Sequence, residues 1–107
     1  MQLRIHSVAI RLVFEVRPML EAIQRRDQGL GQQLVDAMAS VPANIAEGSD
    51  QAGKRRLNHY RFAMGSAREV WSHLQVAHAL GYIGDPRHVE NGFNHVIGTL
   101  MKIVRPR

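Results

Sequence analysis

Asn44 and Glu47 are the two residues whose types and spacing most suggest chemistry. They lie three positions apart, after Pro42 and before Gly48, so in a helix they share one face. An amide and a carboxylate on one face could recognise a ligand or move a proton. They could also bond backbone groups that the proline and the helix end leave unpaired. We favour this structural role, and we expect Gly48 to close the helix in the left-handed conformation.

Six histidines raise the question of a metal site. His59 and His73 are fourteen residues apart and His88 and His95 are seven apart, whereas metal ligands on a helix use spacings of three or four. His78 falls on an apolar stripe, so we expect it in the core with a hydrogen bond. The chain has no cysteine, no Gly-x-Ser-x-Gly turn and no glycine-rich phosphate loop. We therefore predict no catalytic site, no metal and no cofactor.

The chain is basic, with 14 Lys and Arg against 9 Asp and Glu and a net charge of +5. No acidic residue lies between Asp50 and Glu69, and this run holds five cations: Lys54, Arg55, Arg56, Arg61 and Arg68. Arginine pairs bidentately with phosphate, so the run predicts weak nucleic-acid binding that does not depend on sequence and is carried mainly by Arg55, Arg56 and Arg61. Two alternatives remain open. The cations could form a solvated surface that keeps the protein soluble, or Glu47 could pair with Arg61 or Arg68 and withdraw that arginine from phosphate.

Four apolar patterns with helical spacing predict the elements that carry these residues. The patterns run through four segments, residues 5–23, 30–45, 57–78 and 89–103. Ser49 or Asp50 should cap the start of the third helix, Gly81 should end it, and Asp85 should start the fourth. Short connections force neighbouring helices to run antiparallel. The prediction is an all-α, antiparallel up-down four-helix bundle that forms one domain over residues 1–107.

The third helix carries apolar or small residues on two faces. One face belongs to the core, whose most buried members should be Leu12, Leu34, Ile45, Leu57, Trp71, Leu74, Phe93 and Leu100. Most residues on the other face are small or apolar, where a monomer should be polar. This face is formed by Asn58, Phe62, Ala63, Gly65, Val70, Ser72, Val76, Ala77 and Ala79. Burial of this second face predicts a homo-oligomer with Phe62 and Val76 in the contact.

Composition also indicates the compartment. A chain without cysteine suits a reducing cytosol. Arg4, Arg11 and Glu15 interrupt the apolar N-terminal segment, which therefore resembles neither a signal peptide nor a membrane span. We expect a cytoplasmic protein with no membrane contact.

The stretch over residues 40–49 resembles the signature of a small four-helix-bundle family, the proteins encoded in intervening sequences of 23S ribosomal RNA genes. The accessory variability proteins of diversity-generating retroelements are members of the same family. The likeness extends to residues on both sides of the stretch: Leu34, Ala37, Gly65, Ser66, Ala67, Arg68, Glu69, Leu80, Gly81, Tyr82 and Ile83. It implies a ring-shaped oligomer, a pentamer.

The resemblance also bears on function. In the retroelement members a basic ring works beside a reverse transcriptase and its RNA, which implies RNA or DNA, and a reverse transcriptase or another protein, as partners. Our prediction is a non-enzymatic, homo-oligomeric accessory protein that binds nucleic acid weakly and without sequence preference. The alternative is an oligomeric scaffold that binds another protein and has no nucleic-acid role. Binding of generic RNA and DNA at varied salt separates the two.

Overall fold

The computed structural model describes residues 4–105, which form helices joined by short turns. Helix α1 spans Arg4–Arg26, α2 Gln28–Ser49, α3 Gly53–Ala79 and α4 Glu90–Val104, and a 3-10 turn, η1, covers Pro86–Val89. No strand occurs within residues 4–105. The prediction of an all-α four-helix bundle is confirmed.

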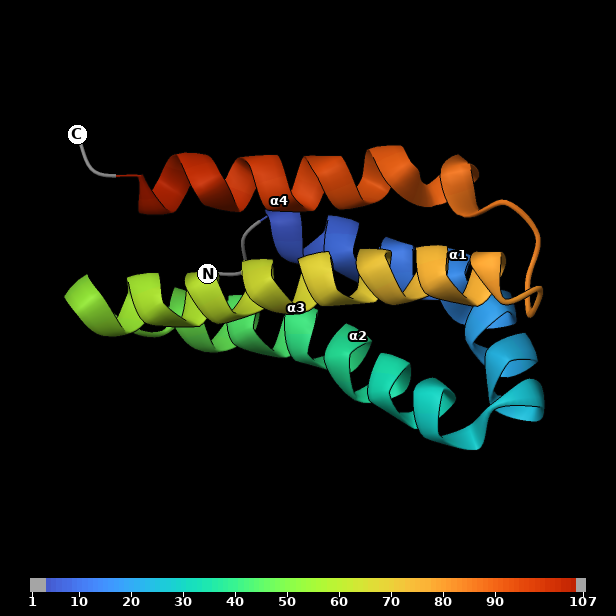
Figure 1. The fold of residues 1–107 in the computed structure, drawn as a ribbon. Helices are drawn as coiled ribbons and strands as arrows, with labels where there is room; N and C mark the ends of the chain where they lie inside the picture. Colours follow the sequence, from blue (N-terminus) through green and yellow to red (C-terminus); the bar gives the residue numbers. More distant parts are fainter. Residues whose placement is uncertain (1–3, 106–107) are drawn as a thin grey trace.

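Each helix packs against its neighbours in sequence, and α4 also packs against α1. In Figure 1 each helix runs opposite to the one before it, with α1 lying behind α3. This order fits the predicted up-down arrangement and leaves α1 and α3 on a diagonal. The end of α2, the start of α3 and the end of α4 lie at the same end of the bundle, at the left of Figure 1.

Two of the predicted turn signals are present. Gly81 has a φ of +80°, the left-handed conformation that ends α3. Asp85 precedes η1, and its Oδ1 accepts a hydrogen bond from the backbone N–H of Arg87 at 2.9 Å. This contact lowers the pKa of the Asp85 carboxyl below its ordinary value, with help from the Arg87 guanidinium.

The predicted cap of α3 is wrong. Ser49 still belongs to α2, where its Oγ donates to the carbonyl of Ile45 at 2.9 Å. Because α2 continues past Gly48, the chain reverses over residues 50–52 and α3 begins after Ala52. Ala52 has no side chain that can accept a hydrogen bond, so the N-terminus of α3 has no side-chain cap.

Six of the eight residues predicted for the core are fully buried, while Leu57 and Trp71 remain partly exposed. On α3 the buried face is formed by Tyr60, Ala63, Met64, Ala67, Val70, Leu74 and Ala77. Small side chains at Ala63, Val70 and Ala77 let the neighbouring helices approach closely, and this turns part of the predicted outer face into core. His78 is exposed in the last turn of α3, with Nδ1 3.2 Å from the carbonyl oxygen of Ile83, so its placement in the core was wrong.

Candidate nucleic-acid interface

Three of the five predicted cations form a line along the outer face of α3. Lys54, Arg61 and Arg68 follow one another at intervals of seven residues, which is about two helical turns, so they project from the same side of the helix. All three are exposed. We call these residues the basic line.

The other two cations turn away from this line. Arg56 is half-buried, and its guanidinium carbon lies 5.4 Å from the centroid of the Tyr60 ring. Arg55 is exposed and lines a pocket between α2 and α3. The structure therefore brings three of the five together and gives Arg55 and Arg56 different surroundings.

None of the five cations has a carboxylate partner in the described residues. The ion pairs found within residues 4–105 are Arg17–Glu21, Arg87–Asp85 and one between Glu69 and His73 that requires protonated histidine. Arg61 donates only to Asn58 Oδ1, at 3.3 Å. The alternative in which Glu47 pairs with Arg61 or Arg68 is wrong. The charge of the basic line is therefore available to an external anion.

Asn44 takes part in a chain of hydrogen bonds that links α2 to α3. Its Nδ2 donates to the backbone carbonyl of Ser40 at 2.9 Å and lies 3.1 Å from Ser40 Oγ. Ser40 Oγ lies 2.7 Å from Ser66 Oγ on α3, and Asn44 Oδ1 lies 3.0 Å from His59 Nδ1, also on α3. Asn44 thus bonds a backbone carbonyl, but Ser40 lies inside α2 and its carbonyl is not one that Pro42 or the helix end leaves unpaired, so the structural role predicted for Asn44 is wrong.

Glu47 does not have the structural role predicted for it. Its carboxylate is exposed and makes no hydrogen bond or ion pair within residues 4–105. Asn44 and Glu47 therefore have different roles. The Asn44 amide links α2 to α3 by hydrogen bonds, whereas the Glu47 carboxylate has no hydrogen-bond or ion-pair partner within residues 4–105.

Gly48 is helical and buried, so its prediction as a left-handed helix end is wrong. A Cβ at this position would lie 2.5 Å from Tyr60 Cε1 and 3.2 Å from the carbonyl oxygen of Arg56. The glycine is required because the Tyr60 ring and the backbone of α3 lie against α2 at this point. Gly48, a residue of the signature, thus allows α2 and α3 to pack closely at this point.

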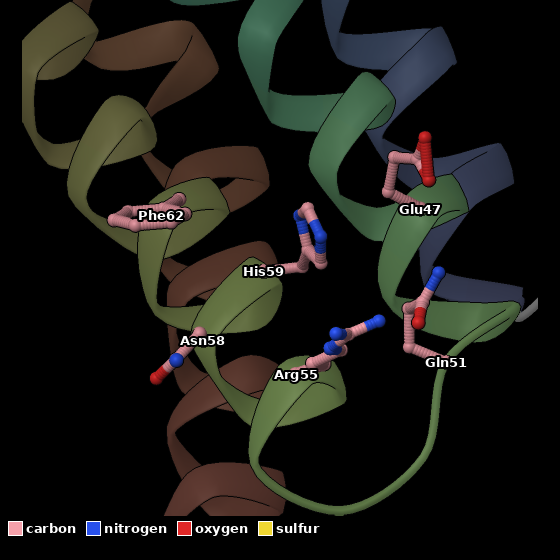
Figure 2. A pocket seen from close by; sticks show the side chains of 6 residues that line it. All are labelled: Glu47, Gln51, Arg55, Asn58, His59 and Phe62. Carbon is pink, nitrogen blue, oxygen red and sulfur yellow. The ribbon is translucent and has the colours of Figure 1, made fainter.

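The pocket between α2 and α3 has a volume of about 440 Å³. It is lined by Glu47, Gln51, Arg55, Asn58, His59 and Phe62. In Figure 2 Arg55, Gln51 and His59 surround the space between the two helices, with Glu47 beside it on α2. Asn58 and Phe62 lie on the outer side of α3 in the same view. A free carboxylate, an amide, an imidazole and a guanidinium thus meet at one site.

Comparison with known proteins identifies the family. Residues 1–102 match the family described as 23S rRNA-intervening sequence protein. The chain belongs to this family. No curated protein sequence matches it.

A solved structure has the same fold. It is a protein of unknown function from the S23 ribosomal protein family of Bacteroides thetaiotaomicron, with a TM-score of 0.82. The alignment covers 95% of this chain and 99% of that one at 16% sequence identity. At this identity the likeness supports the bundle fold, including all four helices, and no particular activity.

Sequence reasoning missed His59 and Ser66 as partners in the polar chain. Ser40 and Asn44 are four apart on one helix, a spacing that lets their side chains meet. The contacts across to α3 have no such signal, because His59 and Ser66 are fifteen and twenty-six residues from their partners.

Two residues predicted for an oligomer contact are exposed on α3, Phe62 at 62% and Val76 at 44%. The apolar face around them is smaller than predicted because Ala63, Val70 and Ala77 are buried in the bundle. On α1, Phe14 is 67% exposed and Ile10 38%. Exposed apolar side chains therefore occur on both members of the diagonal pair of helices.

Residues 4–105 contain no group of three or more His, Asp or Glu side chains that could hold a metal ion. No helix in the same range is long and apolar enough to cross a membrane.

Proposed function

We propose that this protein is a non-enzymatic, cytoplasmic accessory protein that forms a homo-oligomer and binds nucleic acid weakly through its phosphates. The observation that carries the proposal is the basic line of Lys54, Arg61 and Arg68, exposed and without a carboxylate partner within residues 4–105. Arg55 adds a cation next to Lys54, at the start of α3. Contacts of this kind attract any sequence, because phosphates position a strand without specifying it.

The geometry of the basic line suits a flexible single strand. Its cations are about 10 Å apart along α3, so one subunit can engage only a few phosphates. On single strands each phosphate contact contributes a slope of about 0.7 to the dependence of log affinity on log salt. The basic line should therefore contribute a slope of about 2 for each subunit, which is weak binding that salt abolishes.

Self-association would multiply this attraction. Phe62 and Val76 on α3 and Ile10 and Phe14 on α1 lie on opposite sides of the bundle, because the two helices are diagonal. A contact between one side of a subunit and the opposite side of the next is heterologous, and it closes into a ring when the rotation permits. We adopt the pentamer that the family resemblance implies. A ring repeats the basic line around its circumference and raises the avidity for a long strand.

The family description refers to 23S rRNA and the solved structure to the S23 ribosomal protein family, so RNA is the first nucleic acid to test. A protein that handles RNA, such as a reverse transcriptase, is the protein partner that the resemblance implies.

The test compares two variants of equal charge. Lys54→Gln/Arg61→Gln/Arg68→Gln removes the basic line, and Arg11→Gln/Arg17→Gln/Arg25→Gln removes three exposed cations from α1. We expect the first variant to lose most affinity for single-stranded RNA at low salt, as measured by fluorescence anisotropy, and the second to lose much less. Wild-type protein that binds neither RNA nor DNA at low salt would favour the scaffold alternative.

A further inference from the structure

Glu47 and His59 belong to the pocket between α2 and α3, which opens near the start of the basic line. We propose that this pocket holds one unpaired nucleotide of a bound strand and prefers a base that carries an exocyclic amine. The inference rests on the proposed nucleic-acid binding and adds to it the part of the strand that the protein distinguishes.

The hydrogen bonds of Asn44 determine which nitrogen of His59 carries a proton. Because Asn44 Nδ2 donates to the carbonyl of Ser40, Oδ1 is the atom that faces His59. An oxygen can only accept, so His59 Nδ1 carries the hydrogen. In the neutral ring Nε2 is then a free acceptor, and it makes no hydrogen bond within residues 4–105.

The pocket offers both acceptors and donors. Glu47 supplies two carboxylate oxygens and His59 supplies Nε2 as acceptors, whereas the donors are the Arg55 guanidinium and the amides of Gln51 and Asn58. A ligand that bonds the acceptors must present N–H groups. Cytosine presents its N4 amine and adenine its N6 amine, whereas uracil has a carbonyl oxygen at the matching position.

A second part of the pocket favours an anion. Arg55 lies beside Gln51 in Figure 2, near the turn that joins α2 to α3. Arg55 also belongs to the first turn of α3, whose backbone N–H groups have no side-chain cap. A donor-bearing ring linked to a phosphate matches both parts, and a nucleotide has this composition.

The size of the site suits one small ligand, and its polar groups suit a base that is unpaired. A volume of about 440 Å³ falls in the range of roughly 300–1,000 Å³ found for small-ligand sites. A base within a duplex already uses its Watson–Crick edge, whereas a base in a single strand can turn that edge toward the protein. His59 is held by Asn44, so the acceptors are in place before the strand binds.

Oligocytidylate and oligouridylate of about ten nucleotides form the matched probes, because their bases differ in presenting an amine or a carbonyl oxygen. Fluorescence anisotropy at one low salt concentration should show that wild-type protein binds oligocytidylate about five- to tenfold more tightly. Glu47→Gln should bring this ratio close to one. It should keep or strengthen binding of oligouridylate, since the variant loses a negative charge beside the strand.

Glu15→Gln is the matched control, because it makes the same charge change at an exposed residue of α1 that, like Glu47, has no ion pair within residues 4–105. This variant should keep the wild-type ratio. Asn44→Ala, which frees His59, should lower the ratio while helicity by circular dichroism shows that the fold is kept.

Equal binding of the two strands by wild-type protein, or an unchanged ratio in Glu47→Gln, would overturn the pocket and leave phosphate binding intact. Failure of wild-type protein to bind either strand would instead overturn the proposed function, and the pocket with it.

Discussion

Gly48→Ala tests the close approach of α2 and α3. The added methyl would lie 2.5 Å from Tyr60 Cε1 and 2.8 Å from Cδ1, about 1 Å inside an ordinary carbon–carbon contact. The Tyr60 ring is fully buried and cannot move into solvent. Overpacking of this severity costs about 3 kcal/mol, and the better helix propensity of alanine returns about 1 kcal/mol. The expected loss of stability is about 2 kcal/mol, or about 10 °C in Tm.

Gly65→Ala is the control for this substitution. Gly65 is also inside a helix, but a Cβ there would meet nothing within 4 Å. The control should gain about 0.5–1 kcal/mol from helix propensity alone. Urea unfolding followed by circular dichroism, at one protein concentration for all variants, measures both.

Gly48→Asn distinguishes the two reasons for a glycine at this position, a left-handed backbone conformation and close contact with Tyr60. A left-handed position accepts Asn more readily than Ala, whereas a position in contact with Tyr60 should tolerate the larger Asn no better than Ala. Gly48→Ala as stable as Gly65→Ala, or Gly48→Asn clearly more stable than Gly48→Ala, would refute the reasoning.

Leu74→Ala should cost about 2–5 kcal/mol in urea unfolding, because the side chain is fully buried; a change below 1 kcal/mol would contradict the core described above. Tyr60→Phe should leave stability unchanged or raise it by about 1 kcal/mol, because the Tyr60 hydroxyl is buried without a hydrogen-bond partner; a clear loss would show that the hydroxyl has a partner. Phe62→Asp should turn an assembly several times the 12.1 kDa mass into monomers in light scattering, and an unchanged mass would exclude Phe62 from the contact. The lowered pKa of Asp85 means that its cap stabilises the fold above about pH 4 and is lost as pH falls through the lowered value; the stability of Asp85→Asn should therefore fall less steeply over this interval, and equal slopes would contradict the assignment.

The helices were predictable because their apolar periods are long and regular. Leu12, Leu34, Leu74 and Leu100 were assigned to the core from spacing alone, and all four are buried. The orientation of α3 was less predictable. Its sequence carries apolar or small residues on two faces, and which of them enter the core depends on how closely the neighbouring helices approach. Ala63 and Ala77 contribute little to a hydrophobic pattern, yet they face the core.

The part of the candidate site that follows helical spacing could be predicted from the sequence, as the helices could. Helical spacing within α3 allows Lys54, Arg61 and Arg68 to be aligned from sequence. The surroundings of Arg56 could not be predicted, because they depend on where the Tyr60 ring lies. The lack of an ion-pair partner for Glu47 could not be predicted either, because it depends on the distance between α2 and α3. Contacts across helices, such as the one between Asn44 and His59, leave no periodic trace in the sequence.

The salt dependence of RNA binding tests the central claim most directly. Titrations of single-stranded RNA over a range of salt concentrations give the slope of log affinity against log salt for wild-type protein and for the variant without the basic line. Phosphate binding by Lys54, Arg61 and Arg68 predicts that the variant's slope is flatter by about 2 for each engaged subunit. Equal slopes for the two proteins, or no binding by wild-type protein at the lowest salt, would contradict the account.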